Sequence, residues 1–396
     1  MKSACMEFEA GDVLYGRLRP YLNKVCRPTF TGLASAEFIT FRDFDRVDPA
    51  FLKYALNHPD FVAFANQVKE GDRPRVKWSQ IRSFPLGIPP IDEQQRIVGT
   101  IDEQFSRLDA GVESLRRANR NLARLRASVL KAAVEGRLVA QDPTEGQGHE
   151  LVVSILEDRR QRWRESQPSK SYKEPQEPSQ PSHDAPETWG IATLESLTDP
   201  KRVICYGILK PKTDGELTVP YVEVRDIRDG RIDVAGLNRT TQELHSQFPR
   251  SHLKAGDVLI AVRGSYDRSA VVPPDLTDAN ISRDVARLAP LEGLVSEFLA
   301  LYLHSPPVLA HFRRIARGVA VKGINISSIR ELSIRVPTVP EQHRIVAEVD
   351  RRLSVVDAMS AMLKASHERS YGLRQSILQE AFAGRLREGA GVGAYR

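Results

Sequence analysis

Two stretches of the chain carry apolar residues in alternating steps of three and four, the spacing typical of a coiled-coil seam. The first seam consists of Ile101, Phe105, Leu108, Val112, Leu115, Asn119, Leu122, Arg126, Val129 and Ala133. The second consists of Val349, Leu353, Val356, Ser360, Leu363, His367, Ser370, Arg374, Ile377 and Ala381. Both seams turn polar in the middle, at Asn119 and His367, which indicates either a solvated stretch or a layer that sets the register. Because the seams extend along equivalent stretches, we expect two long helices that pack as an antiparallel pair.

The ends of these helices follow from the residues that flank the seams. Pro89-Pro90 halts the preceding segment, and we expect the first helix to extend from Asp92 to Leu138. Gly136 and Gly384 are suited to end the first and second helix, since glycine readily adopts the left-handed conformation found there.

The seams belong to an internal repeat. Three pairs of segments align in the same order: 88–98 with 336–346, 51–52 with 298–299, and 11–14 with 256–259. The offsets are 248, 247 and 245 residues, so the register drifts by only three, and we interpret the halves as two copies of one unit. The counterpart of residues 188–252 would precede Phe8, so either the first copy has lost its front part or the start codon assigned to this sequence lies too far downstream.

The segments before the long helices are less regular and predict mixed α/β globules. The turn Gly256-Asp257 leads into the apolar run 258–262, which we expect as a buried strand, and residues 221–224 alternate as a second strand. Residues 298–315 have helical spacing that a pair of prolines interrupts.

The two copies are joined by a helix and a linker. Residues 150–164 have helical apolar spacing with a basic end, and residues 166–186 are rich in proline and serine. The fold class predicted is α+β, with two mixed globules joined by two long antiparallel coiled-coil helices. The expected divisions are a partial first globule (1–90), a central helical region (91–165), a linker (166–187), a second globule (188–338), a distal helix (339–386) and a flexible tail (387–396).

Composition narrows the class of protein. Hydrophobic residues make up 41% of the 396 residues and charged residues 27%, which is typical of a soluble chain with real cores. The formal charge of +6 is compatible with nucleic acid as a partner without requiring it. Three scattered cysteines, no apolar leader and no uninterrupted apolar stretch long enough for a spanning helix predict a cytoplasmic protein with no membrane partner.

Motifs of catalysis are missing from the sequence. It has no glycine-rich phosphate loop ending in Lys-Ser/Thr, no Asn-Pro-Pro-Tyr/Phe stretch and no His-Glu-x-x-His pair. We therefore expect no catalytic residue, no metal site and no cofactor in this chain.

Basic side chains recur at corresponding places in the two copies, on segments expected to be loops. In the first copy they are Arg17, Arg19, Lys24, Arg73, Arg75 and Lys77. In the second copy the candidates are Arg225, Arg263, Ser265, Arg268, Arg283 and Lys322. Arg and Lys would contact phosphates, and Arg and Ser would contact base edges in a DNA groove. The alternative is that these charges only keep the surface soluble.

The arrangement of two globules, each followed by a proline-rich turn, Glu-Gln-x-Arg-Ile-Val and a long helix, resembles the specificity subunit of type I restriction–modification systems. Residues 11–24 (GDVLYGRLRPYLNK) are similar to that family's first-domain motif, and residues 89–98 (PPIDEQQRIV) to the start of its central conserved region. Residues 186–189 with Leu194, 205–208 and 219–227 are also similar to family segments. The resemblance covers nearly the whole chain.

The resemblance implies that each globule is a target recognition domain for one half of a bipartite duplex DNA sequence, and that the helices act as a spacer. It also implies partner subunits that carry the chemistry: methylation subunits that use S-adenosylmethionine, and restriction subunits that use ATP and magnesium. The chain itself would be non-catalytic. Two alternatives remain at this point, a coiled-coil adaptor without DNA specificity and an inactive truncated remnant. A stand-alone nuclease would need an acidic metal-binding cluster, which we do not find in the sequence.

Overall fold

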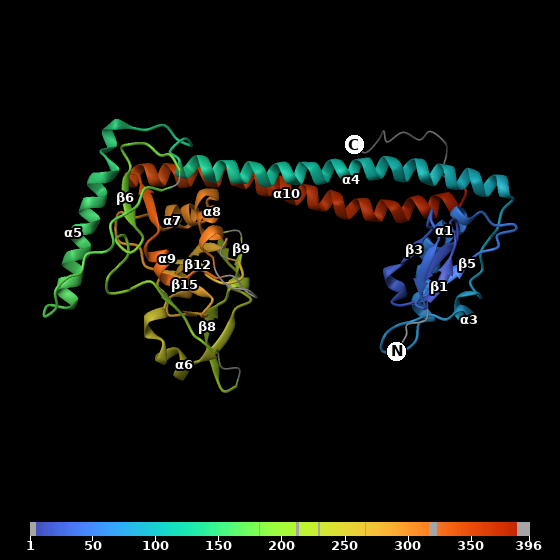
Figure 1. The fold of residues 1–396 in the computed structure, drawn as a ribbon, viewed down its shortest axis with the longest axis horizontal. Coiled ribbons are helices and arrows are strands. Elements are labelled where there is room, and N and C mark those ends of the chain that lie inside the picture. Colours follow the sequence, from blue (N-terminus) through green and yellow to red (C-terminus); the bar gives the residue numbers. More distant parts are fainter. Residues whose placement is uncertain are drawn as a thin grey trace. The chain divides into compact units, whose positions relative to one another are not determined.

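The computed structural model describes residues 5–181, 183–210, 214–228, 230–265, 267–316 and 323–385 (Figure 1). The chain divides into two compact units, one of Met1–Arg120 with Ser360–Arg396 and one of Asn121–Met359. Each unit contains a globule and a stretch of both long helices. Among the described residues, no helix has the length and apolar character required to cross a membrane.

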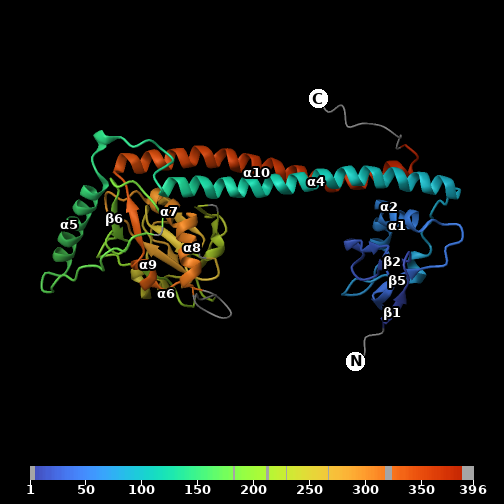
Figure 2. The same cartoon turned by 45° about the horizontal axis from the view of Figure 1, so that its top comes forward.

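The two long helices are α4 (Ile91–Val134) and α10 (Val339–Phe382), and they lie side by side in both views (Figures 1 and 2). Asp109 pairs with Arg374 in the first unit, and Arg126 pairs with Asp357 in the second. Because advancing along α4 means going back along α10, the helices are antiparallel, as predicted. The repeat offset of 248 relates Arg126 to Arg374 and Asp109 to Asp357, so equivalent residues make both pairs.

Both helices end at the glycines expected from the sequence. Gly136 and Gly384 have positive φ angles of 65° and 68°. The amide of Arg137 then bonds back to the carbonyl of Ala132, and that of Arg385 to Glu380, both at 2.9 Å. The expected end at Leu138 was therefore wrong by four residues, because the left-handed turn at Gly136 reverses the chain.

The polar middle of the seams is exposed. Asn119 and His367 both lie on the solvent side of their helices, which favours the solvated stretch over a buried register-setting layer.

The first globule is built on a three-stranded antiparallel sheet in the order β3-β2-β5. Its strands are β1 (Cys5–Phe8), β2 (Val13–Gly16), β3 (Val25–Cys26), β4 (Gly32–Ser35) and β5 (Phe38–Phe41). Its helices are η1 (Pro20–Leu22), α1 (Pro49–Asn57), α2 (Pro59–Gln67) and α3 (Trp78–Ile81). The core lies between the sheet and α2, where Tyr15 packs edge-on against Phe61.

The second globule has the same central sheet with one more strand, in the order β13-β12-β15-β7. Its strands are β6 (Gly190–Thr193), β7 (Cys205–Tyr206), β8 (Leu217–Val222), β9 (Ile227–Arg228), β10 (Arg231–Ile232), β11 (Asn238–Thr241), β12 (Val258–Ala261), β13 (Ser269–Val271), β14 (Asn280–Ile281), β15 (Val285–Leu288) and β16 (Ser333–Val336). Its helices are η3 (Val224–Asp226), α6 (Gln242–Gln247), η4 (Pro249–Ser251), η5 (Pro274–Leu276), α7 (Ser296–Leu303), α8 (Pro306–Ile315) and α9 (Ile326–Arg330).

Three expectations for this globule can be compared with the structure. The strand expected at 258–262 is β12, which confirms it to within one residue. The strand expected at 221–224 was wrong at its end, because η3 begins at Val224, where Asp226 bonds back to the amide of Glu223 at 2.8 Å. The proline pair does more than interrupt a helix, since it forms the first turn of α8.

A buried glutamine joins each globule to its long helix in the same way. The side chain of Gln94 accepts from the amide of Asp48 at 2.7 Å and donates to the carbonyl of Pro89 at 2.8 Å. Its counterpart Gln342 accepts from the amide of Val295 at 2.8 Å and donates to the carbonyl of Pro337 at 3.0 Å. Asp48 and Val295 begin α1 and α7, so one residue type ties three segments together in both repeats.

Between α4 and the second globule, the chain forms η2 (Pro143–Glu145) and α5 (Gly148–Ser166), which confirms the predicted helix. The proline-rich segment after it has no helix or strand among its described residues, but it packs on the second globule. The amide of Ser179 donates to Ser333 at 2.9 Å, and Arg335 donates to Gln180 at 3.0 Å.

Candidate nucleic-acid interface

In the first globule, two loops that carry predicted basic residues lie side by side. We call residues 17–24, between β2 and β3, and residues 68–77, between α2 and α3, the first loop pair. The amide of Val76 donates to the carbonyl of Arg17 at 3.1 Å, and the amide of Arg19 donates to that of Pro74 at 2.7 Å. Six candidates far apart in sequence are thus placed on adjoining loops.

The second globule repeats this arrangement. The second loop pair consists of residues 262–268, between β12 and β13, and residues 316–325, between α8 and α9, of which 266 and 317–322 are outside the described residues. The amide of Ile324 donates to the carbonyl of Val262 at 2.8 Å, as Val76 does to Arg17. The bridge that joins Leu18 to Arg75 also returns between Arg263 and Gly323.

The first loop pair combines free and paired cations. Arg19, Lys24 and Arg73 are exposed and have no ion pair with any described residue. Arg75 is held by Glu37 through two hydrogen bonds, at 2.6 and 3.1 Å, and Lys77 lies 3.1 Å from Glu70.

Two arginines of the first loop pair have unusual surroundings. Arg19 adopts a left-handed backbone conformation, with φ 53° and ψ 69°, which is uncommon for a residue other than glycine or asparagine. Arg17 is half-buried, and its Nε has no hydrogen-bond partner among the described residues. Strain and an unsatisfied donor both favour a functional role for this loop.

In the second globule, Arg263 and Arg283 stand on either side of Asp284. The Nε atom of each is 3.8 Å from the same carboxylate oxygen of Asp284, and their side chains are 56% and 49% exposed. That oxygen makes no hydrogen bond to a described residue, so both guanidinium groups lie near one negative charge and keep their donors available. Ser265 is half-buried, and its amide bonds to the carbonyl of Arg263 at 3.0 Å.

The remaining candidate residues differ in how much their side chains are engaged by other protein groups. Arg225 is exposed on η3 and pairs with Glu223 at 2.9 Å. Arg268 donates to the carbonyls of Val224 and Ile227, at 3.0 and 3.3 Å, so its guanidinium holds η3 against the loop. Lys322 lies outside the described residues.

Sequence reasoning missed several residues beside these loops. The ammonium of Lys69 lies 5.7 Å from the ring centre of Tyr21, which joins the two loops of the first pair. In the second globule, the hydroxyl of Tyr206 donates to the carbonyl of Ile324 at 3.1 Å, and burial raises its pKa. Asp284 was also missed, although an acid directly after Arg283 was a visible signal.

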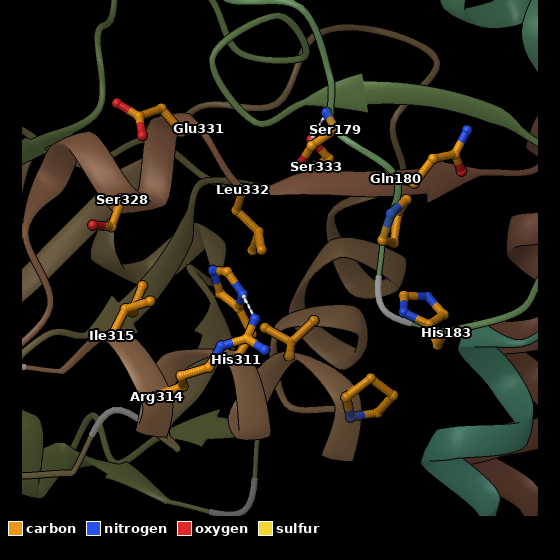
Figure 3. A pocket seen from close by; sticks show the side chains of 13 residues that line it. Ser179, Gln180, His183, His311, Arg314, Ile315, Ser328, Glu331, Leu332 and Ser333 are labelled. Carbon is orange, nitrogen blue, oxygen red and sulfur yellow. Dashed lines mark hydrogen bonds between the residues drawn. The ribbon is translucent and has the colours of Figure 1, made fainter.

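A separate cavity of about 310 Å³ lies where the proline-rich segment meets α8 and α9 (Figure 3). Arg314 donates to His311 at 3.1 Å on its wall, and Glu331 and His183 line it as well. Burial lowers the pKa of both histidines, which favours neutral imidazoles. Among the described residues, no group of His, Cys, Asp and Glu is arranged to hold a metal ion, here or elsewhere.

No family model matches the chain. Similar curated proteins include the type I restriction enzyme EcoBI specificity subunit of Escherichia coli, 28% identical over 76% of this chain and 58% of that protein. The EcoEI specificity subunit of the same species is 20% identical over 96% of this chain and 74% of that protein. The chain is thus similar over most of its length to specificity subunits of type I restriction enzymes.

A solved structure supports the fold of this chain. A chain in the structure described as "Structural basis underlying complex assembly and conformational transition of the type I R-M system" matches 98% of this chain and 85% of its own length. The TM-score is 0.62 and the sequence identity 22%, so this likeness bears on the fold alone. The match to the EcoBI subunit leaves more than a third of that relative uncovered.

Proposed function

We propose that the chain is the DNA-recognition subunit of a type I restriction–modification complex, in which each globule contacts one half of a bipartite duplex target. The observation that carries this proposal is the recurrence of one loop pair, joined by the same backbone contacts, in two globules of different sequence. Exposed arginines stand on both loop pairs. Recognition of two different half-sites requires similar cationic loops for the phosphates and different side chains for the bases. Two globules with the same loop pair and different sequences meet both requirements.

Within this interface, we infer that the basic side chains without an acidic partner contact DNA phosphates, and that the two arginines beside Asp284 contact bases. Arg19, Lys24 and Arg73 have no acidic partner among the described residues, so they are available to phosphate oxygens. Arg263 and Arg283 lie within ion-pair distance of Asp284 without a hydrogen bond to its Oδ1, so their donors are available for bidentate contact with a base edge.

The proposed complex includes methylation subunits that bind the long helices. Three apolar residues of α10, Val355, Met359 and Met362, follow steps of four and three and are 53%, 49% and 70% exposed. Such a row on a helix is typical of a surface that packs against another protein. In this assignment the methylation subunits use S-adenosylmethionine, restriction subunits use ATP and magnesium, and this chain catalyses nothing.

The experiment is a selection of bound duplexes from a random pool, with the methylation subunit present. We expect the preference to be carried mainly by residues 188–336, so one half-site should be stronger than the other. Two equally strong half-sites would contradict this expectation, and no preference at all would contradict the proposed function. The R263Q substitution should relax preference at one position, while K201Q, beside Glu165 of α5, serves as the matched control.

A further inference from the structure

One acid stands within the cationic surface of the second globule. Asp284 lies in the turn between β14 and β15, and the Nε atoms of Arg263 and Arg283 each lie 3.8 Å from its Oδ1 atom. A surface that binds DNA gains affinity from positive charge, because each cation that neutralises a phosphate releases counterions. A carboxylate at this position opposes that gain, so its presence points to a role other than attraction of the DNA backbone.

Hydrogen bonds of the backbone hold this turn against two neighbouring segments. The amide of Val262 donates to the carbonyl of Asp284, and the amide of Arg283 donates to the carbonyl of Ile208, each at 2.9 Å. Val262 begins the first loop of the second loop pair, so the turn is attached to the loop that carries Arg263. A side chain on such a fixed backbone is suited to a contact that depends on exact placement.

Arg263 in turn packs against the other loop of the pair. Its backbone pairs with Gly323 through an isolated β-bridge, and a Cβ atom built on Gly323 would lie 3.2 Å from the Cγ atom of Arg263. The stem of Arg263 therefore lies against Gly323, and its guanidinium reaches toward Asp284. The contact between the arginine and the acid is thus positioned by backbone on both sides.

The carboxylate of Asp284 is only loosely engaged within the protein. Its Oδ1 atom is buried and has no hydrogen-bond partner among the described residues. The side chain as a whole is 38% exposed, so the Oδ2 side of the group faces outward. A carboxylate that lacks a donor inside the fold is available to a donor that a ligand brings.

The chemistry of duplex DNA limits which donor this can be. Phosphate oxygens accept hydrogen bonds and carry negative charge, so they repel a carboxylate. In the major groove, the donors are the amino groups at N4 of cytosine and N6 of adenine. The adenine amino group lies beside the acceptor N7, which repels a carboxylate, whereas the cytosine edge presents a donor alone. Cytosine N4 is therefore the donor that best suits Asp284.

The neighbouring arginines extend this match to a whole base pair. In the major groove, a G·C pair presents the guanine acceptors N7 and O6 beside the cytosine donor. A guanidinium next to a carboxylate has the complementary order, with donors beside an acceptor. Because 3.8 Å is too long for a hydrogen bond, Arg263 and Arg283 stay close to Asp284 without using their donors on its Oδ1 atom.

We propose that Asp284 is a specificity-determining residue, which accepts a hydrogen bond from N4 of the cytosine in a G·C pair while Arg263 or Arg283 donates to the guanine. This assignment rests on the proposed function and adds to it the identity of one base pair in the target. Where no cytosine amino group is presented, nothing offsets the repulsion between the carboxylate and the phosphates. Asp284 therefore also lowers affinity for other sequences.

The test compares D284A with the unsubstituted full chain, each with the methylation subunit, on the duplex recovered from the selection. At each G·C pair of the half-site bound by residues 188–336, cytosine is replaced by 2-pyrimidinone, which lacks the amino group and leaves the guanine edge unchanged. For the unsubstituted chain, one such replacement should weaken binding about tenfold or more, measured by fluorescence anisotropy. For D284A, the same replacement should change binding by no more than about twofold, since the two partners form one interaction.

The matched control is D275A, which removes an equal charge from an exposed position on η5, beyond the end of β13 that is far from the loop 262–268. It should respond to the missing amino group like the unsubstituted chain. Far-ultraviolet circular dichroism checks that D284A is folded, as expected for a side chain without a hydrogen bond at its buried oxygen.

The outcomes separate this assignment from the proposed function. If D284A and the unsubstituted chain respond equally to the missing amino group, if D284A alters affinity by the same factor for all duplexes, or if the half-site has no G·C pair, the assignment to Asp284 is wrong while DNA recognition stands. If the unsubstituted chain prefers no sequence at all, the proposed function is wrong and the assignment falls with it.

Discussion

The two globules share the parts that carry the loop pairs and differ in the parts that close their cores. Both have the three central strands and the backbone contacts that join the two loops. Among the described residues, β7, the β6–β16 ladder and the packing of α5 are found in the second globule. The backbone contacts that join the two loops are the same in both globules and involve none of these covering segments.

The substitution with the largest expected effect on stability is at Gly148, where α5 packs against the β6–β16 ladder. A Cβ atom there would lie 2.1 Å from the carbonyl oxygen of Val336 and 2.9 Å from the amide of Gly190. G148A should destabilise the second unit by about 3 kcal/mol, because backbone on both sides must shift. Urea unfolding, with hydrogen exchange to separate the units, measures it.

The control for Gly148 is Gly99, which is exposed on α4 and has no atom within 4 Å of an added Cβ. G99A should stabilise the first unit by about 0.5–1 kcal/mol through helix propensity. Equal effects of G148A and G99A would mean that α5 does not pack tightly on β6 and β16.

The buried glutamines test whether the two globules are held to their helices equally. Q342A should cost about 3 kcal/mol, since it leaves the amide of Val295 and the carbonyl of Pro337 without partners. Q94A should cost about 2 kcal/mol, because Pro89 is only half-buried and water can reach the freed groups. Unfolding of each unit measures both, and the exposed Q161A is the control. A larger loss for Q94A would show that the first unit is the more tightly closed.

Two neighbouring arginines separate stability from recognition in the second loop pair. R268Q should destabilise the second unit by about 1–2 kcal/mol, because its guanidinium bonds to two carbonyls. R263Q should leave stability unchanged and lower affinity for a selected duplex by about 1–3 kcal/mol if Arg263 reads a base. If Arg263 contacts only a phosphate, affinity should fall by the same factor for all DNA sequences. The slope of log affinity against log salt concentration should then decrease in magnitude by about one. Loss of folding in R263Q would contradict its assignment to the interface.

The smallest expected effect concerns pH. Burial raises the pKa of Glu341 above its ordinary value of 4.5, so the folded state holds its proton more tightly than the unfolded state. The stability that this gives is fully present below the unfolded pKa and is lost as pH rises through the folded pKa. The advantage of E341Q over the unsubstituted chain should therefore grow above pH 4.5 and then level off. Urea midpoints from pH 4 to 8 measure this, and a difference between the two chains that stays constant over this range would contradict it.

Much of the framework could be predicted because its signals are local. The seams, the glycine stops and the offset between repeats depend on spacing along the chain, and α4, α10, Gly136 and Gly384 confirm them. The pairing of the two loops in each globule was less visible, since it depends on backbone bonds such as Val76 to Arg17.

The sequence could not reveal which arginines donate hydrogen bonds within the folded protein and which remain exposed. Arg287 is 1% exposed and donates to the carbonyls of Arg202 and Arg250, more than thirty residues away in sequence. Arg268 is likewise engaged, while Arg263, five positions before it, is exposed. One guanidinium looks like another in sequence, and only long-range carbonyl partners separate a structural cation from a free one.

The pairing of Gly190 with Val336 has a consequence for how such a chain can change over time. The second globule begins and ends on neighbouring strands of one ladder, so its two junctions with the rest of the chain are side by side. A genetic exchange that replaced everything between these junctions would need to preserve this ladder, the buried glutamine contact and the apolar face that packs on the long helices. Variation on the loops far from these contacts is then possible without rebuilding the frame that carries them.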